Sequence, residues 1–245
     1  MKNNTFIYPA VEMSEGDGVD VDRLFPVSHK MMNYDPFVLW DNFNLGPDRG
    51  FPTHPHRGFE AITYMFSGSI EHKDNLGNHS TVTAGGAQCF TAGRGMEHSE
   101  MPDSKIESNG IQLWINLAKN QKSVEPGYQQ VDKENIPQKE ITGGRVSVIV
   151  GDNSPLKLNT PVRYLEVSLE KGASLSEKVP KDFRGFIYLL NGQLKVNTES
   201  VVAKEAFFFE NIEELDIKSL SKSHFMLCMG KPHGEPIKQH GPYVD

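Results

Sequence analysis

Short runs of β-branched and aromatic residues, separated at close intervals by turn residues, limit the folds open to this sequence. The turns are clusters of Gly, Asn, Asp and Pro at 74–78, 85–86, 143–144 and 151–153. No long stretch shows the 3.6-residue apolar period of an amphipathic helix. The pattern predicts an all-β protein, a sandwich or barrel of short strands. Strands are expected at 37–40, 61–66, 112–117, 145–150, 163–169 and 185–190.

The two halves of the chain carry a similar motif. Arg57-Gly58-Phe59 precedes Tyr64-x-x-x-Gly68, and Arg184-Gly185-Phe186 precedes Tyr188-x-x-x-Gly192, with a spacing that differs by three residues. Two copies of one β-barrel explain this repeat. The polar stretch 119–144 is the best linker candidate. We therefore expect a metal-binding domain at 1–130 and a degenerate second domain at 131–245, whose terminal arm packs back.

Charge and cysteine content exclude several classes of protein. The 245 residues carry a net charge of −7, with 25 Lys and Arg against 32 Asp and Glu, which argues against direct nucleic-acid binding. Two distant cysteines, Cys89 and Cys228, exclude a disulfide framework, favour a cytoplasmic location and are expected to be buried. No apolar run reaches the roughly 18 residues of a membrane helix, and residues 1–10 lack the pattern of a secretory signal. We expect no membrane association.

Two short motifs point to a metal site. His54-Pro55-His56 is followed about 40 residues later by His98-Ser99-Glu100. On a strand, residues i and i+2 share a face, so each pair can direct two donors at one point. Three imidazoles and one carboxylate suit a divalent transition metal and leave coordination positions open for chemistry. A lone His-x-His is often coincidental, but two such pairs in one β domain favour metal binding.

The wider pattern resembles the pirins, a family of proteins with two cupin barrels. The resemblance rests on FPTHPHRGFEAITYMFSG and TAGRGMEHSEMP, on Asp35-Pro36-Phe37, and on GEPI and QHGP near the end, so it spans most of the chain. It implies metal ligands at His54, His56, His98 and Glu100, with Fe(II) preferred and Mn, Ni, Cu, Co or Zn as alternatives. The chain departs from many pirins at 21–25 and at Cys89-Phe90.

The role of Glu60 stays open at this point. The general cupin spacing, His-x-His-x-x-x-Glu, would make Glu60 a ligand, while the pirin pattern gives that role to Glu100. Glu60 could then accept a hydrogen bond from a ligating histidine, as carboxylates near metal sites commonly do. Arg57 and Arg94 are expected to be ion-pair partners or substrate contacts. His72 and His79 flank a polar turn and are expected on the solvated surface. In the second half, Lys178 and Pro180 align with the histidine pair, which predicts no metal there.

The resemblance implies two alternative functions. The first is a metal-dependent dioxygenase that cleaves quercetin-like flavonols or related enediols with O₂, in which Glu100 or Glu60 takes the hydroxyl proton. Its partners would be a small aromatic substrate and O₂. The second is an iron redox-sensing module, similar to a transcription cofactor, that binds a protein partner without catalysis.

Overall fold

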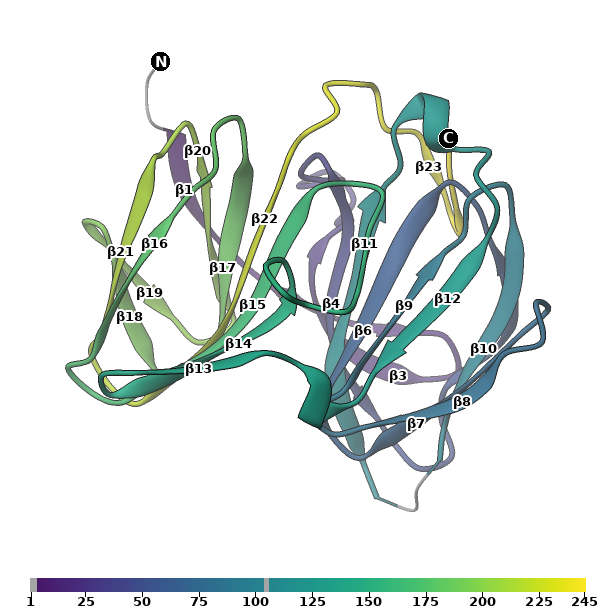
Figure 1. The fold of residues 1–245 in the computed structure, drawn as a ribbon, viewed down its shortest axis with the longest axis horizontal. Coiled ribbons are helices and arrows are strands. Elements are labelled where there is room, and N and C mark those ends of the chain that lie inside the picture. The colour runs from purple at the N-terminus through teal and green to yellow at the C-terminus, as the bar shows by residue number, and fades with distance from the viewer. Residues whose placement is uncertain (1–3, 104–105) are drawn as a thin grey trace. The chain divides into compact units, whose positions relative to one another are not determined.

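The computed structural model describes residues 4–103 and 106–245 and consists almost entirely of β-strands, so the predicted all-β class is confirmed (Figure 1). Contacts divide the chain into two units. We call residues 11–135, 156–160 and 233–245 the first barrel, and residues 4–10, 136–155 and 161–232 the second barrel. Within the described residues, no helix has the length and apolar character needed to cross a membrane.

The first barrel joins a seven-stranded sheet to a four-stranded sheet, and both are antiparallel. The strand order is β12-β9-β6-β11-β4-β3-β2 in the larger sheet and β5-β10-β7-β8 in the smaller one. Their bounds are β2 Val11–Glu15, β3 Val19–Phe25, β4 Phe37–Leu45, β5 Phe51–His56, β6 Phe59–Ser67, β7 Ser69–Asp74, β8 His79–Thr83, β9 Ala87–Thr91, β10 Met96–Pro102, β11 Ser108–Asn116 and β12 Gly127–Val131. Two 3₁₀ turns, Lys119–Gln121 and Lys133–Asn135, flank β12.

The second barrel repeats this arrangement strand for strand. Its sheets have the orders β1-β20-β17-β22-β15-β14-β13 and β16-β21-β18-β19. The bounds are β1 Asn4–Pro9, β13 Gln138–Ile141, β14 Gly144–Val150, β15 Val162–Leu169, β16 Ser174–Lys178, β17 Arg184–Asn191, β18 Gln193–Val196, β19 Glu199–Val202, β20 Glu205–Glu210, β21 Glu214–Ser219 and β22 Ser223–Gly230. Even the irregularities correspond, because the pairing of β3 with β4 shifts after Arg23 and that of β14 with β15 shifts after Val148.

The glycines of the sequence repeat have a common structural cause. Gly68 and Gly192 follow the equivalent strands β6 and β17, with φ of +70° and +94°. A Cβ at either position would overlap a serine hydroxyl, Ser108 in one barrel and Ser223 in the other. Only glycine fits this conformation at such close range. The repeated Tyr-x-x-x-Gly therefore marks the same tight turn twice.

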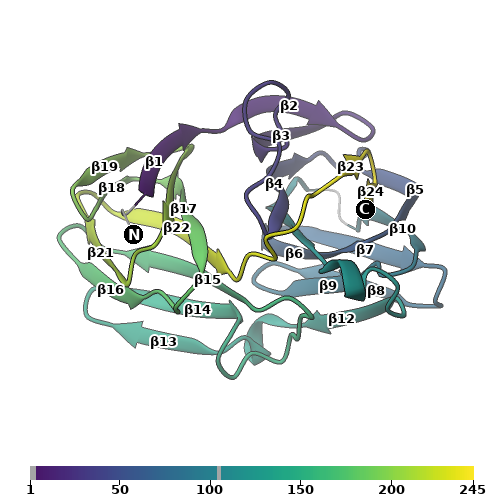
Figure 2. The same cartoon turned by 90° about the horizontal axis from the view of Figure 1, so that it is seen from above.

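Each end of the chain belongs to the other barrel than the one expected: the first strand lies in the second barrel, and the last residues lie in the first barrel. Strand β1 pairs with β20 in the second barrel, from Asn4 opposite Glu210 to Pro9 opposite Glu205. The last residues form β23 (Gln239–His240) and β24 (Tyr243–Val244) on the first barrel, where the Val244 amide donates to the Arg57 carbonyl at 3.0 Å (Figure 2). The expected linker is also structured, because β12 extends the larger sheet of the first barrel by pairing with β9.

Candidate metal centre

Strands β5 and β10 carry the two histidine-containing motifs and pair in the smaller sheet of the first barrel. Their register places His98 opposite His54 and Met96 opposite His56. The Nε2 atoms of His54 and His98 are 3.2 Å apart, and one nitrogen of each of the three rings lies within 4.8 Å of the others. His56 and His98 are 3% and 1% exposed, while His54 is half-buried. The structure thus brings three of the predicted residues to one point.

Backbone carbonyls orient two of these rings. Nδ1 of His54 lies 2.7 Å from the Pro52 oxygen, and Nδ1 of His56 lies 3.3 Å from the Pro242 oxygen. A carbonyl can only accept, so we assign the proton to each Nδ1, which leaves the Nε2 lone pairs free. Burial, together with the adjacent His54, lowers the pKa of His56 to about 3. Burial also lowers the pKa of His98 well below its ordinary value. Both rings are therefore neutral at pH 7, as metal ligands must be.

Glu100 lies beside the histidines and is 2% exposed. Its Oε1 accepts hydrogen bonds from the Thr63 hydroxyl at 2.8 Å and from the Gln88 amide, and its Oε2 accepts one from Gln112 at 2.9 Å. With His72 and His98, Glu100 forms a second group of possible ligands whose atoms lie within 4.8 Å. His98 belongs to both groups, but Glu100 is not grouped with His54 and His56, so the four predicted ligands do not fall within one such group.

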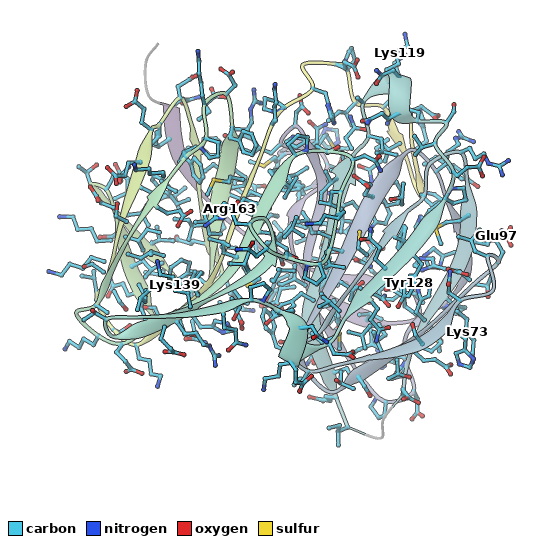
Figure 3. All side chains as sticks on the ribbon, viewed as in Figure 1. Lys73, Glu97, Lys119, Tyr128, Lys139 and Arg163 are labelled. Atoms are coloured by element: carbon cyan, nitrogen blue, oxygen red, sulfur yellow. The ribbon has the colours of Figure 1, made fainter. Side chains whose placement is uncertain are left out.

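His72 is fully buried, so its expected place on the solvated surface was wrong. Its Nε2 lies 3.1 Å from Asp74 Oδ2, its Nδ1 lies 3.5 Å from Nδ1 of His98, and its ring stacks on Tyr128 at 4.2 Å between centroids. The alternation of β7 explains the error, because His72 points inward while its neighbour Lys73 points outward (Figure 3). The sequence did contain a signal for this: His72 stands two residues after Ile70, so on a strand it shares the face of a buried apolar residue. His79 is exposed, as expected.

Glu60 is fully buried and serves a different part of the barrel. Its carboxylate accepts hydrogen bonds from the Thr91 hydroxyl at 3.0 Å, from the amide and side chain of Asn159, and from the Thr160 amide. No histidine is among its hydrogen-bond partners in the described part of the chain. Glu60 therefore anchors residues 156–160 to the first barrel. Arg57 and Arg94 both form ion pairs, with Asp245 and Glu125.

A cavity of about 640 Å³ opens onto the candidate centre, a size typical of small-molecule sites. His54, His56 and Glu100 form part of its wall, and Gln239, Gly241 and Pro242 close it from the C-terminal segment. The rest is largely apolar and aromatic: Val21, Leu39, Phe43, Phe51 and Trp114.

The cavity wall also carries an ion pair that the sequence did not reveal. Asp41 is 5% exposed, Arg23 is 7% exposed, and both line the cavity together with Glu15. Burial raises the pKa of Asp41 to about 6, although Arg23 opposes the shift. The sequence offered only Glu100 and Glu60 as candidates to take a proton from a ligand, and the structure adds two further carboxylates. Asp41 and Glu15 face the cavity, and Glu60 is not among its lining residues.

The second barrel has no comparable centre within the described residues. Leu215 lies opposite Glu177, and the Val179 amide bonds the Glu213 carbonyl, so Glu177 and Val179 occupy the places of His54 and His56. The expected positions, Lys178 and Pro180, were displaced by one residue, because strand register rather than sequence spacing sets the correspondence. A hollow of about 1190 Å³ adjoins Val179, but none of its lining residues is a histidine.

The donor set of the first barrel fits a divalent transition metal. Three imidazoles with converging nitrogens, next to a carboxylate, supply borderline nitrogen and hard oxygen ligands. The Nε2 atoms of His54 and His98 lie 3.2 Å apart. A cation that bound both lone pairs would stabilise this arrangement. Because His54, His56 and Glu100 line the cavity, a metal held there would be reachable by a small molecule.

Comparison with known proteins gives these observations a family. Two tandem cupin barrels, one with a histidine-rich centre, define a bicupin protein. The pirin family model matches residues 18–115, and the model of the pirin C-terminal cupin domain matches residues 164–245. Pirin from Homo sapiens is 39% identical over 244 residues, covering 95% of this chain and 84% of its own length. The chain therefore belongs to the pirin family.

Solved structures agree with this assignment. Quercetin 2,3-dioxygenase from Acinetobacter baumannii superposes with a TM-score of 0.89 at 27% identity, covering 98% of this chain and 90% of its own. A bacterial pirin from Escherichia coli, in complex with nickel(II), has a TM-score of 0.78 at 21% identity and covers 94% and 99% of the two chains. The latter shows the shared fold alone.

Proposed function

We propose that the protein is a metal-dependent dioxygenase of quercetin-like flavonols, with one metal held by His54, His56, His98 and Glu100. The observation that carries the proposal is the convergence of three imidazoles, two of which, His54 and His56, line an aromatic-walled cavity. The solved quercetin 2,3-dioxygenase with the same fold supports the reaction class. Fe(II) is the metal we expect, with Mn, Ni, Cu, Co and Zn as alternatives.

The chain's own residues suggest how the site would work. When bound, the metal would supply two open positions for the adjacent oxygens of a flavonol and would acidify its hydroxyl group. Phe43, Phe51 and Trp114 offer flat apolar surfaces for the rings of the substrate and exclude water. The Glu100 carboxylate, held by Thr63, Gln88 and Gln112, is positioned to receive the hydroxyl proton.

The test is aerobic incubation of metal-loaded protein with quercetin, followed by loss of the flavonol absorbance. Turnover that disappears in His56→Ala and persists in His79→Ala, which changes an exposed histidine, is the expected result. The same assay is run with Fe, Mn, Ni, Cu and Co. Absence of turnover with all five metals would contradict the dioxygenase proposal.

The alternative function is an iron redox-sensing module that binds a protein partner. It is favoured by relatives that are named pirin and carry no enzyme name. In that case the metal would still bind, and the loaded protein would cycle between Fe(II) and Fe(III) without consuming quercetin.

A further inference from the structure

Six polar residues stand in register across the larger sheet of the first barrel, one on each of six neighbouring strands. The pairings run from Arg23 to Asp41, Gln112, Thr63, Gln88 and Gln130. We call these six residues the polar row. All lie at one level of the barrel, on the face that carries the candidate centre.

Part of the polar row holds the Glu100 carboxylate in place. Thr63, Gln88 and Gln112 donate hydrogen bonds to Glu100, and Gln88 is joined to Gln130 through the Tyr128 hydroxyl. These residues therefore orient a proposed metal ligand. Arg23 and Asp41 make no hydrogen bond to Glu100 within the described residues, so this task does not account for them.

Arg23 and Asp41 form a bidentate pair at the cavity. Arg23 Nε lies 2.7 Å from Oδ1 of Asp41 and Nη2 lies 2.6 Å from Oδ2, while Nη1 reaches Glu15 at 2.5 Å. Both side chains of the pair are 8% exposed. Each carboxylate oxygen can accept more than one hydrogen bond, so Arg23 leaves Asp41 with further acceptor capacity. Asp41 lines the cavity, where a ligand can use that capacity.

The second barrel shows that the fold does not require this pair. At the equivalent register positions it carries Val148, Leu165, Leu227, Ile187, Phe207 and Ile7, in the same order across the sheet. Every one of these residues is apolar and belongs to, or packs against, the core of that barrel. A buried ion pair is often no more stabilising than apolar residues of similar size. Stability alone therefore does not explain Arg23 and Asp41.

We propose that the Arg23–Asp41 pair is a ligand-recognition site, which selects neutral molecules whose hydroxyl groups donate hydrogen bonds to Asp41. Arg23 holds the carboxylate in place, and the aromatic wall receives the rings that bear the hydroxyl groups. Beside Arg23, the carboxylates of Glu15 and Asp41 outnumber the one guanidinium, so a ligand that places a carboxylate next to Asp41 would be disfavoured. This inference deepens the proposed function and rests on it for the identity of the ligand.

The second barrel supplies the test variant. Arg23→Val combined with Asp41→Leu introduces the pair that the equivalent positions already contain. Binding of quercetin, flavone and flavone-8-carboxylate is measured anaerobically, so that no turnover occurs, by quenching of the fluorescence of Trp40 and Trp114. Native protein should bind quercetin about 10-fold or more tightly than flavone, which lacks the hydroxyl groups, and should bind the carboxylate least well. In the double variant the preference for quercetin over flavone should fall by about 5- to 10-fold, and any preference that remains comes from the metal, which would still hold the adjacent oxygens of quercetin.

Controls separate recognition from folding and from the proposed reaction. Arg163→Val with Glu177→Leu removes an ion pair of the second barrel and should leave all three affinities unchanged. Metal content and melting temperature are recorded for each protein, and Asp41→Asn, which keeps the side-chain shape, replaces the double variant if that one fails to fold. An unchanged preference for quercetin in a folded, metal-loaded variant would overturn the inference. Normal preference without aerobic turnover would instead contradict the dioxygenase proposal alone.

Discussion

The smaller sheets of the two barrels have the same strand order, but their inward residues differ in polarity. In the first barrel β7 and β10 place His72 opposite Glu100, whereas in the second barrel β18 and β21 place Val196 opposite Ile217. Leu215 takes the position of His98 by the same register. The comparison teaches that turns and strand pairing specify this fold, while the inward residues of a few strands decide whether it carries chemistry.

The two barrels also differ in how their interiors are stabilised. The inward residues of the second barrel join one apolar core that includes Leu215, Ile217 and Phe207. The first barrel instead buries histidines, carboxylates and amides, whose burial is tolerated where they find hydrogen-bond partners or, at the proposed centre, a metal. We expect the second barrel to be the more robust of the two in the absence of metal, since its core needs no such partners.

The largest expected effect concerns where metal binds. Protein purified without chelator should contain about one equivalent of metal per chain, and His56→Ala should remove nearly all of it, because a neutral buried imidazole is lost from the centre. Val179→Ala, at the equivalent place in the second barrel, should leave the content unchanged. Metal analysis of the three proteins checks this. Two tightly bound equivalents in the native protein would break the comparison between the barrels.

The second effect separates two buried carboxylates of the first barrel. Glu100→Gln removes a negative charge beside the histidines, and we expect metal affinity to fall by more than about 100-fold. Glu60→Gln should retain metal, because Glu60 bonds Thr91, Asn159 and Thr160. Its cost should instead be about 1–3 kcal/mol of unfolding free energy. Metal titration and denaturant unfolding distinguish the two, and metal loss in Glu60→Gln alone would show that the general cupin spacing is the correct guide.

A smaller effect is expected at His72, which the second barrel replaces with Val196. His72→Asn should weaken metal binding by about 10–100-fold, because Asp74 and His72 hold the ring of His98. His79→Asn, on the same hairpin and exposed, is the matched control. Metal affinities of both variants at one pH provide the measurement. Equal affinities would mean that His72 serves only to fill space.

The smallest effect concerns the C-terminal segment of the first barrel. Lys122 donates to the carbonyls of Gly58 and Val244 and to Asn116, and burial lowers its pKa to about 8. Between about pH 8 and 10.5 the lysine is then neutral in the folded chain and protonated in the unfolded one. This group therefore makes stability rise with pH across that window, and its contribution is constant below about pH 8 and above about pH 10.5. Lys122→Met should remove this contribution, seen as a difference between the unfolding free energies of the two proteins against pH.

The local features of the fold could be predicted from the sequence, whereas strand partners could not. Runs such as 61–66 and 185–190 have the composition of strands, and both form strands. Strand β12 lies in a polar stretch that resembles a linker, because its stability comes from pairing with β9 and not from its own residues. The same limit applies to the site. His54, His56 and His98 stand in recognisable motifs, but Asp41 and Arg23 acquire meaning only when the register places them together.

The exchanged ends of the chain have a consequence for biosynthesis. Pro242, whose carbonyl oxygen lies 3.3 Å from Nδ1 of His56, follows all the strands of the second barrel in the sequence, and β1 pairs with β20 about 200 residues later. Contacts over such separations form slowly, because a long loop must close first. On a ribosome, neither barrel can be completed when half of the chain has emerged. The candidate metal pocket is therefore completed only after every strand of the second barrel has been made, so we expect metal to bind late in folding and not to an isolated, newly made first barrel.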